Sequence, residues 1–169
     1  DTTCFITPET CPERMTQLTA DGNGNLSPAW SPDGTRLAYN SKANGNWDIY
    51  TMNTDGTDVR QVTITPGNDL APVWSPDGRF IVYASTGGDT TSNYYKNGLL
   101  MRIPAQGGVA TRLAADFDEQ IGGVTWTARG LFFGGRARTL SRLYRVDPER
   151  GTTSVAVDTP INITSVSFS

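Results

Sequence analysis

The alternation of apolar and polar residues predicts short strands, and nearly the same pair of strands occurs twice. The run AWSPDGTRLAY at 29–39 returns as VWSPDGRFIVY at 73–83, so that Trp30 and Trp74 are 44 residues apart. In both runs, apolar positions flank a Ser-Pro-Asp-Gly turn, in which Pro presets one φ angle and Gly supplies the positive φ that closes the turn. The pattern therefore predicts a repeated β-hairpin.

The spacing of the repeats predicts the architecture, because a period of roughly 40 to 45 residues is typical of a four-stranded propeller blade. The second repeat follows the plan of the first, with a longer loop at 86–97. A weaker third repeat keeps Trp126 and Gly130 but loses the Pro and Asp of the turn. We therefore expect an all-β fold of antiparallel four-stranded blades, with complete blades at 20–63, 64–114 and 115–158.

Partial repeats remain at both ends of the chain. Residues 1–19 match the second half of a blade, and 159–169 match a first strand, with Phe168 in the position of the tryptophan. Propellers typically close with about four to eight blades, and closure removes exposed strand edges. We therefore expect an incomplete ring in this chain, which either belongs to a longer protein or is completed by neighbouring chains.

The repeated motifs resemble those of a known family. WSPDG at 30–34 and 74–78, the DIY strand at 48–50 and the TDG turn at 54–56 resemble the WD40-like, or PD40, repeats of TolB-type β-propellers. The resemblance covers almost the whole chain. It implies the propeller fold, and several functions, since similar blades occur in TolB proteins, in the propeller domains of prolyl-oligopeptidase-like peptidases and in many secreted proteins.

Composition narrows the possible partners. The net charge of −3 argues against a general nucleic-acid binder, and no apolar run approaches the roughly 20 residues of a membrane-spanning helix, so we expect no membrane insertion. The charge is uneven: 1–125 holds 8 basic and 14 acidic residues, whereas 126–169 holds 6 and 3. The arginines of the last third are either solvated or contact an acidic neighbour.

The two cysteines, Cys4 and Cys11, indicate the compartment. A pair so close together in a chain without histidine does not make an ordinary four-ligand zinc site, and a short-range disulfide is the better interpretation. Because disulfides persist in oxidising compartments, we predict a periplasmic or extracellular protein.

The sequence offers no catalytic residues. Without histidine, neither a Ser-His-Asp nor a Cys-His arrangement exists within these residues. The segment 21–25 resembles the first half of a calcium loop, but Leu26 stands where Gly is expected and Pro32 where the bidentate Glu is expected. We therefore expect no enzyme, no metal site and no cofactor.

One set of residues is expected to maintain the structure of the repeat. The tryptophans hold equivalent positions, which predicts packing between neighbouring sheets, and the Asp and Gly residues shape the turns. The set comprises Trp30, Asp33, Gly34, Trp74, Asp77, Gly78 and Trp126.

Strand direction divides the other residues between two faces. The first-to-second and third-to-fourth turns share a "turn face", whereas the second-to-third loops and the blade connections share a "loop face". Loops on a rigid scaffold often bind partners, and adjacent tyrosines supply contact area, although the insertion that holds them is equally well explained as a plain loop. The predicted binding residues are Tyr94, Tyr95, Asp89, Asp21, Asn25, Asp69, Asp116 and Asp118.

Three functions follow from this interpretation. The first is a non-catalytic secreted scaffold that binds a protein or a glycan through the loop face. The second is a subunit of a fibre or oligomer in which copies of the chain complete one another through open blade edges. The third is the propeller part of a prolyl-oligopeptidase-like peptidase whose catalytic domain lies outside these residues.

Overall fold

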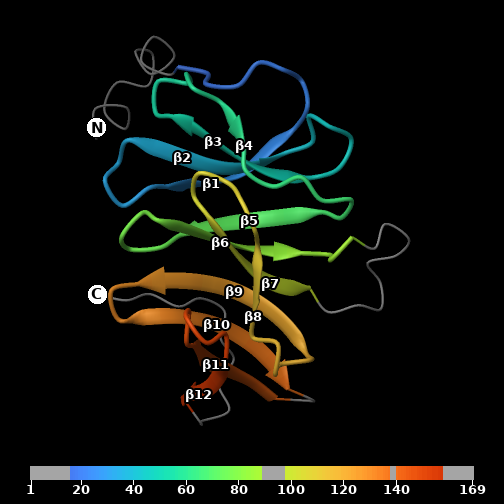
Figure 1. The fold of residues 1–169 in the computed structure, drawn as a ribbon, viewed down its shortest axis with the longest axis vertical. Helices are drawn as coiled ribbons and strands as arrows, with labels where there is room; N and C mark the ends of the chain where they lie inside the picture. The colour runs from blue at the N-terminus through green and yellow to red at the C-terminus, as the bar shows by residue number, and fades with distance from the viewer. Residues whose placement is uncertain (1–15, 89–97, 138–139, 158–169) are drawn as a thin grey trace, which may run out of the picture.

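The computed structural model of the 169-residue chain describes residues 16–88, 98–137 and 140–157. These residues form three four-stranded antiparallel sheets that stack one on the next (Figure 1). No helix occurs within the described ranges. The prediction of an all-β chain built from three four-stranded blades is therefore confirmed.

The strands of each blade pair in the order in which they occur along the chain. Blade 1 comprises β1 (Asn25–Trp30), β2 (Arg36–Ser41), β3 (Asp48–Asn53) and β4 (Arg60–Gln61). Blade 2 comprises β5 (Asp69–Trp74), β6 (Phe80–Ser85), β7 (Leu99–Pro104) and β8 (Thr111–Leu113). Blade 3 comprises β9 (Gln120–Thr127), β10 (Gly130–Ala137), β11 (Leu140–Val146) and β12 (Thr153–Val157).

The predicted partial blades lie almost wholly outside the described residues. Of the segment 1–19, only residues 16–19 are described, and they form no strand. Leu18 packs against the apolar residues of blade 1. The predicted strand at 159–169 lies outside the described residues.

Each first strand carries a bulge with a left-handed residue. Ser27, Ala71 and Gly123 have φ angles of 54°, 53° and 58°, and the strand register shifts at the same places. The amide of Ala71 donates a hydrogen bond of 3.3 Å to Oδ1 of Asn40, which belongs to blade 1. The bulge therefore helps to join two blades as well as bending its own strand.

The core lies between the blades. Ala38, Ile49 and Val62 of blade 1 pack against Trp74, Ile81, Tyr83 and Ile103 of blade 2. Val82, Leu100 and Leu113 of blade 2 pack against Leu131, Phe133, Tyr144 and Val146 of blade 3. Because the side chains of a strand point alternately to its two faces, the middle blade contributes to both clusters.

The strand directions place the predicted turn face on one side of the stack. The turns that connect β1 to β2, β5 to β6 and β9 to β10 all lie on the left in Figure 1. Each connection between blades runs from the fourth strand of one blade to the first strand of the next. Together with the β2–β3 loop, these connections position the candidate site.

Candidate functional site

The Ser-Pro-Asp-Gly turns use their polar groups within the turn. Oγ of Ser31 donates to Oδ1 of Asp33 at 2.6 Å and accepts from the amide of Arg36 at 2.9 Å. The hydrogen bond from Ser31 is the main reason that the pKa of Asp33 is lowered. Ser75 and Asp77 repeat this contact at 2.6 Å in blade 2. These aspartates therefore hold the turns together.

The glycines of these turns have the left-handed conformation that the motif predicts. Gly34 and Gly78 have φ angles of 70° and 71°. Both amides donate to the carbonyl of the serine three residues earlier, at 2.9 Å in each turn. The turn face is thus built from regular, internally bonded turns.

The three equivalent tryptophans have different surroundings. Trp74 is 7% exposed, and its Nε1 donates to the carbonyl oxygen of Ala29 in blade 1 at 3.1 Å. Trp126 is half-buried against the cluster between blades 2 and 3. Trp30 is 63% exposed, because none of the described sheets covers its side of blade 1. The expected packing between sheets is thus present for Trp74 and Trp126.

On the loop face, Asp21 and Asn25 lie together in a fixed turn. Oδ1 of Asp21 accepts hydrogen bonds from Nδ2 of Asn25 at 2.8 Å and from the amide of Asn23 at 3.2 Å. These bonds, with that from Asn25 the largest effect, lower the pKa of Asp21. The turn borders a shallow polar depression of about 380 Å³, which is also lined by Gln17 and Thr19.

Two asparagines outside the predicted set of binding residues hold the neighbouring loops together. Nδ2 of Asn46, in the β2–β3 loop, donates to the carbonyl of Thr65 at 2.8 Å. Oδ1 of Asn68 accepts from the amide of Trp47 at 3.2 Å. The β2–β3 loop is therefore tied to the connection between blades 1 and 2. No local sequence motif predicts these contacts, because the two partners of each hydrogen bond are about 20 residues apart.

Asp69, predicted on the binding face, is buried between blades 1 and 2 at 0% exposure. Its Oδ2 accepts from Oγ1 of Thr65 at 3.0 Å. Burial raises the pKa of Asp69, and it also raises that of Asp48, which is 2% exposed and is repelled by Asp69. Two carboxyl groups thus lie together in the buried interface, or seam, between blades 1 and 2. Desolvation there disfavours their charged forms.

The remaining predicted residues lie elsewhere. Asp116 and Asp118 are in the connection from blade 2 to blade 3, whereas Asp21 precedes the first strand of blade 1. Oδ2 of Asp116 accepts from the amide of Thr153 at 2.9 Å, and so joins this connection to β12. The other predicted residues, Asp89, Tyr94, Tyr95, Cys4 and Cys11, lie outside the described residues.

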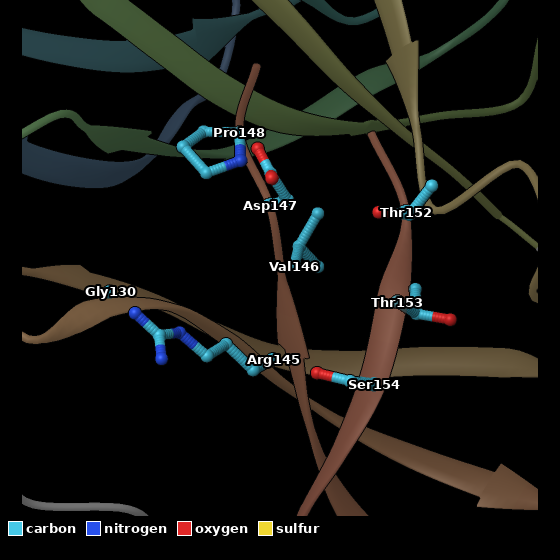
Figure 2. A pocket seen from close by; sticks show the side chains of 8 residues that line it. All are labelled: Gly130, Arg145, Val146, Asp147, Pro148, Thr152, Thr153 and Ser154. Atoms are coloured by element: carbon cyan, nitrogen blue, oxygen red, sulfur yellow. The ribbon is translucent and has the colours of Figure 1, made fainter. Parts of the chain in front are cut away.

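A polar pocket of about 450 Å³ lies on blade 3. The guanidinium of Arg145 extends toward Gly130, and the turn between β11 and β12 borders the other side (Figure 2). Thr152, Thr153 and Ser154 complete its wall, and the hydroxyl oxygens of Thr152 and Ser154 point toward the side of Arg145 (Figure 2). A cationic group beside hydroxyl donors is suited to binding a carboxylate or a carbonyl oxygen.

Two further properties concern only the part of the chain that the structure describes. It contains no group of three or more His, Cys, Asp or Glu side chains that could hold a metal ion. It also contains no helix that could cross a membrane.

Comparison with known proteins agrees with this architecture. Residues 9–151 match the family model of the TolB β-propeller domain, PD40. A stretch of 37 residues is 51% identical to the Tol-Pal system protein TolB of Thioalkalivibrio sulfidiphilus (strain HL-EbGR7); it represents 22% of this chain and 8% of that protein.

Solved structures share the fold at low sequence identity. A putative TolB from Agrobacterium tumefaciens superposes with a TM-score of 0.65 and 20% identity, over 80% of this chain and 50% of the other. A puromycin hydrolase gives a TM-score of 0.66 and 20% identity, over 86% of this chain and 24% of the other. The chain thus spans half or less of the length of these proteins. Because the family model matches most of the chain, and the motifs had predicted the same resemblance, this protein belongs to the TolB β-propeller family.

Proposed function

We propose that this chain is a non-catalytic, secreted propeller module that binds a protein partner through its loop face. The absence of histidine from the 169 residues leaves no Ser-His-Asp or Cys-His arrangement within them. We therefore assign these residues the role of a scaffold that presents a fixed surface. The periplasm or the extracellular space is the proposed compartment.

The observation that carries the proposal is the backbone of the loop face, on which hydrogen bonds hold exposed groups in place. On the loop face, exposed groups such as Asn23 stand on backbone that Asp21 holds in place. Ile64, in the neighbouring connection, is 84% exposed. Exposed apolar and polar groups on a preorganised backbone favour binding, because little conformational entropy is lost on association.

The relatives favour a protein as the ligand. TolB of T. sulfidiphilus is named as a protein of the Tol-Pal system, and it shares 51% identity over the matching 37 residues. A protein partner at the loop face is therefore the proposal for this chain, and a glycan is the alternative ligand.

Site-specific photocrosslinking in cells that produce the protein tests the proposal. A photoreactive residue is placed at Asn23 on the loop face or, as a matched control, at Thr35 on the turn face; both positions are exposed in blade 1. We expect one discrete protein adduct from the Asn23 position and none from Thr35. Equal labelling from both positions, or no adduct from Asn23, would contradict the proposal.

A second candidate function rests on the likeness to the puromycin hydrolase, of which this chain covers 24%. In that case, these blades are the propeller part of a peptidase, and the catalytic domain lies outside them. The mass of the polypeptide isolated from its source distinguishes the two functions. A mass large enough for a further enzymatic domain supports the peptidase, and a mass close to that of this chain excludes it.

A further inference from the structure

Two Asn-Gly pairs lie on the loop face of blade 1. Asn23 and Gly24 are in the segment before β1, and Asn44 and Gly45 are in the β2–β3 loop. All four residues are exposed, and the two glycines have positive φ angles of 71° and 97°. A further Asn-Gly pair, at 97–98, lies partly outside the described residues. The two described pairs thus have the same sequence and are both open to water, and they differ in their hydrogen bonds.

An asparagine that precedes a glycine can react with its own backbone. The amide nitrogen of the glycine forms a bond with Cγ of the asparagine, the bond from Cγ to Nδ2 breaks, and the displaced group takes up the proton of the backbone nitrogen and leaves as ammonia. Water then opens the resulting succinimide ring at either carbonyl, which gives aspartate or isoaspartate. Glycine favours ring closure because it has no Cβ to obstruct it. Contacts that keep the two reacting atoms apart should slow the reaction.

The side chain and the backbone of the pair in the β2–β3 loop are both held. Nδ2 of Asn44 donates to the hydroxyl of Tyr50 at 3.0 Å and to Oε1 of Gln61 at 2.8 Å, so both of its protons are used. The amide of Gly45 donates to the carbonyl oxygen of Lys42 at 3.2 Å. The leaving group and the attacking nitrogen are therefore both engaged, and these bonds must open before the ring can close.

The reacting groups of the pair before β1 are less restricted. Neither the carbonyl oxygen of Asn23 nor the amide of Gly24 forms a hydrogen bond with another described residue. The side chain of Asn23 interacts with Asp21, and it lowers the pKa of that carboxyl less than Nδ2 of Asn25 and the Asn23 amide do. The peptide group between Asn23 and Gly24 can therefore turn toward the side chain without breaking a hydrogen bond of its own.

We propose that Asn23 is a site of spontaneous deamidation and that Asn44, although it also precedes a glycine, is protected by its hydrogen bonds. Water is the only co-reactant, and no enzyme is needed. The reaction replaces a neutral amide of the loop face with a carboxylate.

The product changes the surface before β1 in two ways. Aspartate or isoaspartate adds a negative charge beside Asp21, so the pKa of Asp21 should rise. Isoaspartate also adds a methylene group to the backbone, between the bond from the Asn23 amide to Asp21 and the bond from the Lys42 amide to the carbonyl of Gly24. Both changes should alter the affinity for the protein partner proposed above, and this consequence alone rests on the proposed function.

Peptide mapping of the folded full chain by mass spectrometry tests the proposal. The protein is incubated in mildly alkaline buffer, and trypsin then releases Asn23 and Asn44 on separate peptides, 15–36 and 43–60. Fragmentation assigns the mass increase, which results from replacing an amino group with a hydroxyl group, to one asparagine in each peptide. We expect Asn23 to react roughly tenfold or more faster than Asn44, because the hydrogen bonds of Asn44 must break first.

Two references separate an effect of the structure from an effect of the sequence. In denaturant, where the hydrogen bonds are lost, Asn23 and Asn44 should react at similar rates. Asn23→Gln should remove the mass increase of the peptide 15–36 over the same period, because glutamine must close a larger ring, and should leave the rate at Asn44 unchanged. Circular dichroism verifies that the variant is folded.

The outcomes that overturn the proposal concern the rates in the folded chain. Equal rates at the two asparagines, a faster reaction at Asn44, or an Asn23 that reacts only in denaturant would each overturn it. These rates are measured on the isolated chain, without a partner. A failure of the proposed binding function would therefore leave them unchanged, and the two proposals are tested separately.

Discussion

Trp30 and Trp74 occupy the same register position in successive blades, yet Trp30 is 63% exposed and Trp74 is 7% exposed. Both follow the same strand pattern and precede the same turn. The difference arises from the neighbour: blade 1 covers Trp74, and none of the described sheets covers Trp30. The motif thus determines where a side chain stands, and the adjacent sheet determines how much it contributes to stability.

The largest effect should come from truncating the covered tryptophan. Trp74→Ala is expected to lower the free energy of unfolding by about 3 to 5 kcal/mol, because it removes a buried aromatic side chain from the seam. Trp30→Ala should change it by less than about 1 kcal/mol, as at most exposed sites. Denaturant unfolding of both variants measures the two losses. Equal losses would contradict the assignment of the two faces.

The seam between blades 2 and 3 provides a second covered surface. A Cβ at Gly135 would lie 2.6 Å from Cζ of Phe117 and 2.7 Å from Cε2 of Tyr144. Gly135→Ala should therefore cost about 1 to 3 kcal/mol through overpacking. Gly122→Ala is the matched control in the same sheet, because a Cβ there meets nothing within 4 Å. Thermal unfolding that gives equal shifts for the two variants would exclude tight packing at Gly135.

The serines of the two turns should behave alike, because their contacts lie within each turn. Ser31 and Ser75 are 6% and 1% exposed, and each accepts from the amide five residues later at 2.9 Å. Ser31→Ala and Ser75→Ala should each cost about 1 to 2 kcal/mol. Denaturant midpoints that differ as strongly as those of the tryptophan variants would show that the turns also depend on the neighbouring sheet.

The smallest predicted effect is a dependence on pH at the seam between blades 1 and 2. Burial raises the pKa of Asp69 above 3.8, so its contribution to stability is present below that pH and is lost as pH rises through the folded-state pKa. Asp69→Asn should therefore be more favourable at neutral pH than at pH about 4. The measurement is the unfolding free energy of both proteins across this range.

Asp116→Asn is the control of opposite sign. The pKa of Asp116 is lowered, mainly by the amide of Thr153, so its contribution is present above 3.8 and is lost as pH falls. The Asp116→Asn variant should therefore be less stable than the unchanged chain at neutral pH and approach it in acid. The same slope for both variants would contradict the placement of Asp69 in the buried seam.

The repeat period was sufficient to predict the sheets. The 44-residue spacing and the Ser-Pro-Asp-Gly turns predicted three four-stranded blades, because hairpin turns and strand alternation depend on neighbouring residues. The bulges were not predictable, since Ser27 and Ala71 are residue types that rarely adopt positive φ.

The residues of the candidate site were harder to predict from the sequence than the sheets were. Asp69 follows an asparagine and a glycine and so resembles a surface turn, yet its position at the start of β5 places it between two sheets. The contact between Arg102 and the turn at Pro148 joins residues 46 positions apart, and no local pattern records it. Such contacts depend on how the sheets stack, and are found only from the structure.

Hydrogen exchange of the tryptophan indole protons, followed by nuclear magnetic resonance, tests most directly whether the stacking of the blades determines how well their faces are protected. The indole N–H of Trp74 donates to Ala29 within the seam, so it should exchange only when the blades separate, orders of magnitude more slowly than that of Trp30. Equally fast exchange of both protons would contradict the stacked-blade account.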